Sequence, residues 1–151
     1  MDLTKLSLKE KIGQKFIFGV NSSNIDIIIK LIKEYHIGGV ILYKKNYSSY
    51  NEMLSVIKRL KEANKDNKIP LFITIDQEGG RVNRMPLEIV NLKNIHDISS
   101  VNRNLIKDYG KITGKILFSI GINMNFVPVL DICEDNNSKV LFNRCFYGDE
   151  D

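Results

Sequence analysis

The sequence contains few of the residues that bind metals or carry thiol chemistry, with two histidines and two cysteines among 151 residues. Cys133 and Cys145 lack CxxC spacing and a nearby histidine, which is typical of thiols in a reducing cytoplasm and excludes the common zinc motifs. His36 is expected at a helix end and His96 in an irregular segment, and neither has a partner at metal-ligand spacing. The sequence therefore predicts no metal site, and it carries no cofactor signature.

Long apolar runs are also missing. No stretch approaches the roughly 18 apolar residues of a membrane span, and the polar start, MDLTKLSLKEKIGQ, lacks the apolar core of a standard secretion signal. We therefore expect a cytoplasmic protein that does not bind membranes. The patterns GxGxxG and GxxxxGKS/T are absent, which argues against a phosphate-cradling loop.

The charge is nearly balanced, since 22 basic and 18 acidic side chains leave a net charge of +4. The lysines alternate with acids, as in KRLKEANKDNK, and are not gathered with aromatic residues. This pattern is typical of a solvated helix surface, so no nucleic-acid partner is expected. A content of 43% hydrophobic and 26% charged residues indicates one globular domain over residues 1–151.

Hydrophobic periodicity predicts strands that alternate with helices along the whole chain. The predicted strands are 16–20, 40–43, 71–75 and 123–131, and the predicted helices are 7–14, 24–35, 50–60 and 99–120. Two S-x-x-E sequences, Ser7 with Glu10 and Ser49 with Glu52, predict capping boxes. Such an alternation predicts an α/β fold with a parallel sheet, either open or part of a barrel. A closed eight-stranded barrel takes about 250 residues, so a barrel of this length would be half of one.

The stretch LFITIDQEGGRVNR, residues 71–84, carries the strongest functional signal. Asp76 and Glu78 follow a buried strand, and the carboxyl ends of parallel strands are where α/β folds gather ligands and catalytic groups. Two glycines then allow a sharp turn. Arg81 has three interpretations: a pair with Asp76, a pair with Glu78, or a donor to a bound polar group. The plainer alternative is a strand, a turn and a solvated ion pair, without function.

Five segments in order resemble the amino-terminal part of glycoside hydrolase family 3, in particular its bacterial β-N-acetylhexosaminidase branch. They are LKEKIGQ at 8–14, IGGVILYKKN at 37–46, IDQEGGRVNRM at 75–85, GINMNFVPVLDI at 121–132 and NRCFYGDE at 143–150. The resemblance implies a TIM (β/α)8-barrel type of fold with about the first four β/α units present. It also implies hydrolysis of terminal non-reducing β-linked N-acetylglucosamine, in cell-wall (peptidoglycan) recycling, with retention through a glycosyl-enzyme intermediate.

The resemblance assigns roles to five residues. Asp76 would accept hydrogen bonds from hydroxyls of the terminal sugar, and Arg144 would donate to the same ring; Glu78, Arg81 and Asp131 would orient these two. The family's acid/base histidine, in a loop of the type KHxPGHG, and its aspartate nucleophile have no counterpart in the sequence. Both are expected beyond residue 151, so we expect the chain alone to be inactive.

Three hypotheses remain open from the sequence. The first is a truncated hexosaminidase or the front half of a split one. The second is a non-catalytic half-barrel that binds a sugar or a partner, and the third is a β-glycosidase of other sugar specificity. In each case a half-barrel leaves open strand edges and an uncovered apolar interior, which favours aggregation or assembly with a complementary C-terminal half-barrel.

Overall fold

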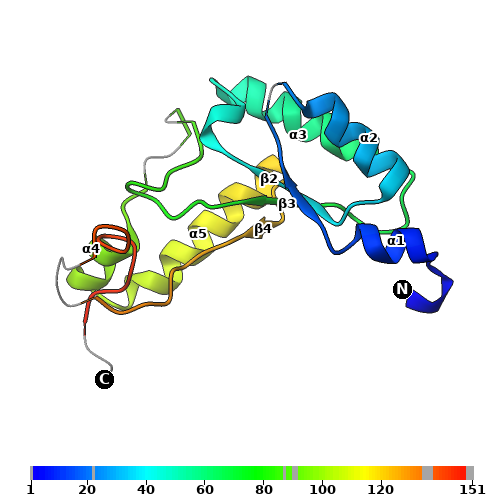
Figure 1. The fold of residues 1–151 in the computed structure, drawn as a ribbon. Coiled ribbons are helices and arrows are strands. Elements are labelled where there is room, and N and C mark those ends of the chain that lie inside the picture. Colours follow the sequence, from blue (N-terminus) through cyan, green and yellow to red (C-terminus); the bar gives the residue numbers. More distant parts are fainter. Residues whose placement is uncertain (1, 22, 87, 90–91, 134–137, 149–151) are drawn as a thin grey trace.

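The computed structural model describes residues 2–21, 23–86, 88–89, 92–133 and 138–148 (Figure 1). Its centre is a parallel sheet with strand order β1-β2-β3-β4. The strands are β1 (Ile17–Gly19), β2 (Gly39–Leu42), β3 (Phe72–Ile75) and β4 (Met124–Asn125). The predicted parallel sheet is therefore confirmed, and among the described residues β1 and β4 have no further strand beside them.

Five α-helices connect and cover these strands. They are α1 (Leu8–Gly13), α2 (Ile25–Tyr35), α3 (Tyr50–Asn64), α4 (Ile95–Val101) and α5 (Leu105–Ile120), with short 3-10 turns at Leu3–Lys5 and Lys44–Asn46. Helices α2 and α3 lie side by side on one face of the sheet, and α5 runs beside β4 (Figure 1). Within the described part of the chain, no helix is both long and apolar enough to span a bilayer.

The hydrophobic core lies between the sheet and these helices. Alternate strand residues point into it, among them Val40 and Ile73, where they meet Ile32 of α2 and Leu60 of α3. All four are at most 1% exposed. This packing explains why the helices keep the apolar spacing that the sequence shows.

The opposite face of the sheet is largely apolar, and several of its side chains are exposed among the described residues. Strand register and alternation place Ile17, Phe72, Met124 and Phe126 on this face, and Phe72 remains 48% exposed. We call these four residues the open face. The sequence led us to expect an apolar interior without its second wall, and that expectation stays a prediction.

The predicted helix 99–120 is right only in part: residues 105–120 form α5, whereas 99–101 belong to α4. Asn102 ends α4 in an extended conformation, and its side-chain oxygen accepts a hydrogen bond from the N–H of Asn104 at 2.9 Å. Asparagine offers the backbone this local alternative to a helical hydrogen bond. Asn94 caps the start of α4, so His96 lies in a helix and not in the irregular segment expected.

The predicted strand 123–131 is also too long. Pairing with β3 stops at Asn125, where β3 itself ends and the turn after Asp76 begins. Without a neighbouring strand, residues after Phe126 follow an irregular path. The capping box at Ser7 and Glu10 is confirmed, whereas the one at Ser49 is half right, because the Glu52 carboxylate binds Ser48 instead.

Candidate functional site

The turn after β3 is shaped by two glycines at the carboxyl end of the sheet. Gly79 and Gly80 have φ angles of 88° and 55°, which residues with a side chain rarely adopt. A Cβ on Gly79 would also lie 2.3 Å from the carbonyl oxygen of Lys93 and 2.6 Å from the hydroxyl of Tyr109. The turn predicted from the two glycines is confirmed, and Gly79 has no room for any side chain.

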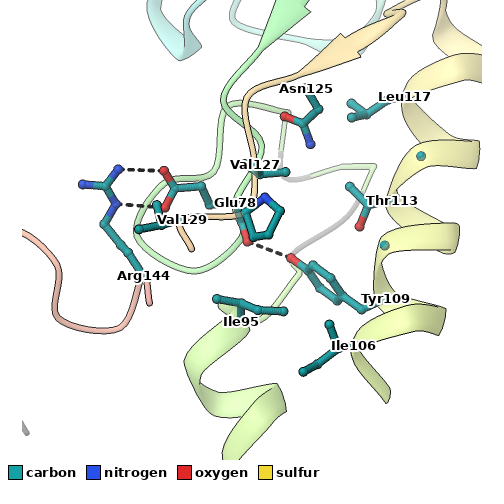
Figure 2. A pocket seen from close by; sticks show the side chains of 13 residues that line it. Glu78, Ile95, Ile106, Tyr109, Thr113, Leu117, Asn125, Val127, Val129 and Arg144 are labelled. Carbon is teal, nitrogen blue, oxygen red and sulfur yellow. Dashed lines mark hydrogen bonds and ion pairs between the residues drawn. The ribbon is translucent and has the colours of Figure 1, made fainter. Parts of the chain in front are cut away.

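The side chain of Tyr109, on α5, is hydrogen-bonded to the main chain of this turn. Its hydroxyl lies 2.8 Å from the carbonyl oxygen of Glu78 (Figure 2). The carbonyl oxygen of Lys93 lies 3.0 Å from the same hydroxyl, so one proton is shared between two acceptors. Burial raises the pKa of Tyr109, which keeps the hydroxyl protonated as a donor. No sequence pattern predicts this contact, because Tyr109 lies 31 residues from Glu78.

Glu78 and Arg144 form a bidentate ion pair across the site (Figure 2). Arg144 donates from Nε and Nη2 to the two carboxylate oxygens of Glu78, each at 2.8 Å. The Glu78 side chain is 9% exposed and that of Arg144 is 26% exposed. Hydrogen bonding to Glu78 raises the pKa of Arg144, and the nearby charges of Glu78 and Asp76 add to this. The pair thus fixes the direction of a permanently charged guanidinium.

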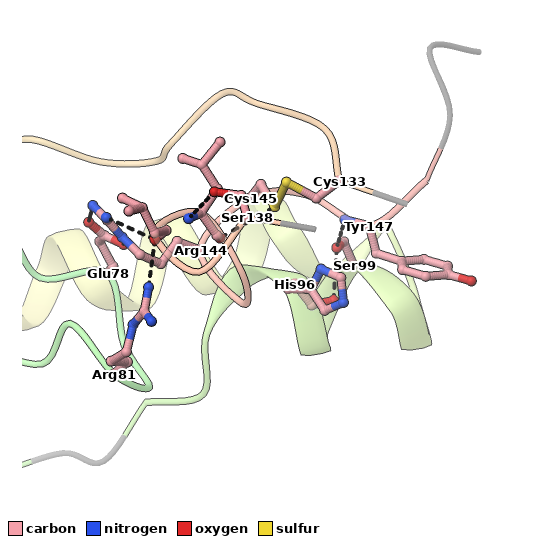
Figure 3. The surroundings of a disulfide bond; sticks show 11 residues. Glu78, Arg81, His96, Ser99, Cys133, Ser138, Arg144, Cys145 and Tyr147 are labelled. Atoms are coloured by element: carbon pink, nitrogen blue, oxygen red, sulfur yellow. Dashed lines mark hydrogen bonds and ion pairs between the residues drawn. A yellow bond between two sulfur atoms is a disulfide. The ribbon is translucent and has the colours of Figure 1, made fainter. Parts of the chain in front are cut away.

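Arg81 has a different partner from either carboxylate proposed from the sequence. Its guanidinium donates to the carbonyl oxygens of Lys139, at 3.0 Å, and Val140, at 2.5 Å (Figure 3). These two residues belong to the segment 138–148, which also carries Arg144. Arg81 therefore ties that segment to the turn after β3, and an orienting role for Arg81 in sugar binding stays a prediction.

The two predicted aspartates differ in their surroundings. Asp76 is half-buried, and none of the described residues donates a hydrogen bond to its carboxylate. Asp131 is exposed, and its main-chain oxygen accepts a hydrogen bond from the N–H of Phe146 at 3.0 Å. The structure therefore brings Asp76, Glu78 and Arg144 together, while Asp131 contacts the segment 138–148 through its backbone.

A pair of amides that sequence reasoning missed supports the start of the turn. The side-chain oxygen of Asn125 accepts from the N–H of Gln77 at 2.9 Å, and its amide donates to the Gln77 carbonyl at 3.2 Å. The buried side chain of Gln77 accepts in turn from the N–H groups of Arg84 and Met85. These bonds extend the link between β3 and β4 past the last strand residues, next to Asp76.

Cys133 and Cys145 form a disulfide, which corrects the prediction of two separate thiols (Figure 3). Their Cα atoms lie 5.9 Å apart, and the two positions are 12 residues apart in the sequence. The even cysteine count was the one available signal, but without CxxC spacing or a secretion signal it was not interpreted as a pair. Among the described residues, no cluster of histidines, cysteines and acids could hold a metal ion.

A cavity of about 250 Å³ borders the ion pair on its helix side (Figure 2). Its polar side chains are those of Glu78, Tyr109, Thr113, Asn125 and Arg144, and the rest of its wall is largely apolar, from α5 and the chain after β4. A sugar ring needs a polar partner for most of its hydroxyls. This cavity therefore suits an apolar side chain better than a sugar.

Comparison with known proteins gives one family. The model of the glycosyl hydrolase family 3 N-terminal domain matches residues 7–151. A beta-hexosaminidase A from Pseudoalteromonas piscicida is 35% identical in an alignment of 126 positions, which covers 78% of this chain and 21% of that protein.

Two solved structures extend this result. A glycoside hydrolase family 3 β-N-acetylglucosaminidase from Paenibacillus sp. str. FPU-7 superposes with a TM-score of 0.81 at 32% identity, over 90% of this chain and 26% of the other. NagZ from Neisseria gonorrhoeae in complex with N-trifluoroacetyl-D-glucosamine has a TM-score of 0.65 at 22% identity, over 87% and 39% of the two chains. The fold is therefore of the TIM-barrel type, with a four-stranded part of the barrel sheet in the described residues.

The chain spans only part of these proteins. It aligns to between 21% and 35% of the length of the first curated relatives. Most of the length of those relatives therefore lies outside the aligned part.

Proposed function

Because the chain belongs to glycosyl hydrolase family 3, we propose that it forms the sugar-holding part of an active site that hydrolyses terminal β-linked N-acetylglucosamine. The relatives named beta-hexosaminidase and β-N-acetylglucosaminidase support this choice of reaction and sugar. The proposal includes a role in recycling cell-wall fragments in the cytoplasm, which rests on the resemblance to the hexosaminidase branch.

The observation that carries the proposal is that Glu78 holds Arg144 in one direction, close enough to Asp76 for the Asp76 charge to raise the pKa of Arg144. A guanidinium has five N–H groups. Arg144 uses two on Glu78 and points a third at the carbonyl oxygen of Val140, at 3.4 Å, which leaves two for a ligand. Asp76 offers acceptor oxygens that no described residue occupies. A charged acceptor next to a charged donor suits neighbouring hydroxyls of one sugar ring.

Glu78 acts on the sugar through Arg144. Both of its carboxylate oxygens are taken by the guanidinium, so neither is left as the main acceptor of a sugar hydroxyl. Its low exposure keeps water from competing for the pair. Glu78 is therefore a positioning residue, and Asp76 is the acceptor in direct contact with the ring.

The two histidines do not supply the missing acid/base group. His36 ends α2 and precedes β2, so it lies at the amino end of the sheet, opposite the turn after β3. His96 packs against the rings of Phe142 and Tyr147, with its ring centre 5.4 Å from that of Tyr147. We therefore propose that the acid/base histidine and the nucleophile come from further β/α units, as the resemblance implies.

We propose a complementary half-barrel as the structural partner that brings these groups. Three apolar surfaces support it: the open face, the cavity beside β4, and a groove of about 540 Å³ beside β1 that contains Phe16 and Phe18. Each lies on the sheet or at one of its two edges. Additional β/α units at those edges would pair the strands and cover all three surfaces.

The test is hydrolysis of 4-nitrophenyl N-acetyl-β-D-glucosaminide by two proteins. One is the 151-residue chain, and the other is a fusion in which the chain is followed by the later barrel strands of the Paenibacillus enzyme. We expect no turnover by the chain and clear turnover by the fusion. Asp76→Ala in the fusion should lower kcat/KM by at least about 100-fold, because the buried polar site loses its acceptor.

The matched control is Asp66→Ala, at an exposed aspartate between α3 and β3, which should leave kcat/KM unchanged. Turnover by the chain alone would contradict the placement of the catalytic groups elsewhere. A folded fusion that binds N-acetylglucosamine without cleaving it would favour a non-catalytic sugar-binding half-barrel. Faster cleavage of another β-glycoside would favour a β-glycosidase of other sugar specificity.

A further inference from the structure

The segment 138–148, which carries Arg144, has little hydrophobic core of its own. Val140 is 66% exposed and Tyr147 is 48% exposed, whereas Cys145 is fully buried. Most other residues of the segment are half-buried. Its position therefore depends on a small number of specific links to the rest of the molecule.

We propose that the Cys133–Cys145 disulfide is a positioning link for Arg144, so that reduction of this bond releases the guanidinium from its sugar-binding position. The inference rests on the proposed function for its consequence in sugar binding, but not for its structural part. Cys145 directly follows Arg144, so the covalent bond fixes the backbone one residue away from the guanidinium-bearing Cα. It adds a second covalent connection between this segment and the preceding chain, besides the main chain itself.

Two backbone hydrogen bonds lie beside the disulfide. Phe146 donates to the carbonyl of Asp131, and Cys133 donates to the carbonyl of Phe146, each at 3.0 Å. Together they form a parallel bridge between Ile132 and Phe146. The bridge brings the chain after β4 alongside the residues that follow Arg144, and the disulfide keeps the two strands of the bridge together.

Besides the Glu78–Arg144 ion pair and the ring contacts of His96 with Phe142 and Tyr147, the segment is held by hydrogen bonds that are partly open to water. Arg81 is exposed where it donates to the carbonyls of Lys139 and Val140, and Ser99 accepts from the N–H of Tyr147 at 2.9 Å (Figure 3). Water competes for such hydrogen bonds, so each adds little net stability. Closing a loop of about a dozen residues covalently favours the closed arrangement by on the order of 100-fold. The disulfide is therefore the strongest single link of the segment.

The two sulfurs differ in access to a reductant. Cys133 is half-buried and Cys145 is fully buried, so the thiolate of a small dithiol reaches the Cys133 sulfur first. That attack forms a mixed disulfide with Cys133 and releases Cys145 as the leaving thiolate. The second thiol of the reductant then displaces Cys133. Two electrons and two protons end on the two cysteines as thiols, and the reductant becomes a cyclic disulfide.

The experiment is hydrogen exchange measured by mass spectrometry on the 151-residue chain, with and without dithiothreitol. We expect amides of residues 138–147 to exchange on the order of 100-fold faster after reduction, while those of α2 and α3 stay unchanged. The Cys133→Ser/Cys145→Ser double variant should match the reduced protein and should not respond to dithiothreitol. Unchanged exchange would overturn the proposal, as would two free thiols, detected by alkylation, in the protein purified without reductant.

A second readout follows Arg144 itself. The Nε–H of an ion-paired arginine gives a separate signal in a 15N-correlated NMR spectrum, and Glu78→Gln, which keeps the disulfide, identifies it by its loss or shift. We expect this signal in the oxidised chain and its loss by exchange broadening in the reduced chain. Persistence of the signal after reduction would show that the other links suffice, and would overturn the inference.

The sugar-binding consequence is measured separately in the fusion protein. Reduction should raise KM for the chromogenic substrate at least about 10-fold and change kcat less, since Arg144 contacts the sugar both before and during the reaction. If exchange responds to reduction and the fusion has no activity in either state, the proposed function fails and the positioning link stands. If the fusion is active and its KM does not respond to reduction, the positioning link fails alone.

Discussion

The packed helix side of the sheet and the segment 138–148 are held in place by different forces. Between the sheet and helices α2 and α3, large apolar side chains such as Ile32 and Leu60 are removed completely from water. The segment 138–148 is instead held by an ion pair, hydrogen bonds to main-chain atoms and one disulfide. The comparison shows that the fold and the site geometry depend on separate sets of contacts, so substitutions can change one and spare the other.

The largest effect is expected where the apolar core is interrupted. Leu60→Ala should lower the free energy of unfolding by about 2–5 kcal/mol, because it removes buried methyl groups and leaves a cavity. Urea unfolding followed by circular dichroism measures this. Leu130→Ala is the matched control, since Leu130 is 79% exposed, and it should change the free energy by less than about 0.5 kcal/mol.

A smaller and more local effect is expected from the ion pair. Glu78→Gln should lower the free energy of unfolding by about 1.5–3 kcal/mol, because a bidentate, charge-assisted pair becomes a neutral contact. In the fusion protein the same change should raise KM, because Arg144 is no longer held in one direction. Glu34→Gln, at an exposed position of α2, is the control. An equal loss of stability in Glu78→Gln and Glu34→Gln would contradict a specific contribution of the ion pair.

The contact between Tyr109 and the turn tests the boundary between the two regions. Tyr109→Phe removes one shared hydrogen bond and should cost about 1 kcal/mol. Amides of the turn at Glu78 to Val82 should then exchange faster, while those of β2 should not. A uniform change along the chain would indicate that the turn and the core unfold as one unit.

The smallest effect is expected at the exposed end of α1. Hydrogen bonds from Ser7, with a further contribution from Lys68, lower the pKa of Glu10 from 4.5 to about 2. A group whose pKa is lowered in the folded state stabilises it above the unfolded pKa and loses this as the pH falls toward the folded pKa. Stability should therefore decline slightly between about pH 4.5 and pH 2. In the Glu10→Gln variant, unfolding curves measured across this pH range should not show the part of the decline that is due to Glu10.

The sheet could be predicted from the sequence because its signals are local. Apolar runs such as 71–75, and the helical spacing of Ile25, Ile28 and Ile32, give each element separately, and their alternation gives a parallel sheet. The break between α4 and α5 was missed because helical spacing continues across it, while the side-chain bond from Asn102 that ends α4 is a property of the folded chain. A single domain over residues 1–151 stays a prediction.

The site was predictable only where its residues adjoin a strand. Asp76, Glu78 and the two glycines follow β3 directly, so their place at the sheet edge was foreseeable. The contacts of Arg81 with Lys139 and Val140, and of Glu78 with Arg144, join residues 58 to 66 positions apart, and no periodicity encodes such distances. The cytoplasmic location also stays a prediction.

The two edges of the sheet have a consequence for symmetry. All four strands are parallel, so the exposed edge of β1 and the exposed edge of β4 are unlike surfaces that run in the same direction. Two copies that join edge to edge in parallel therefore meet head to tail, and each added copy presents a fresh β4 edge. Such growth ends only if the curvature closes a ring, and otherwise it continues as a filament.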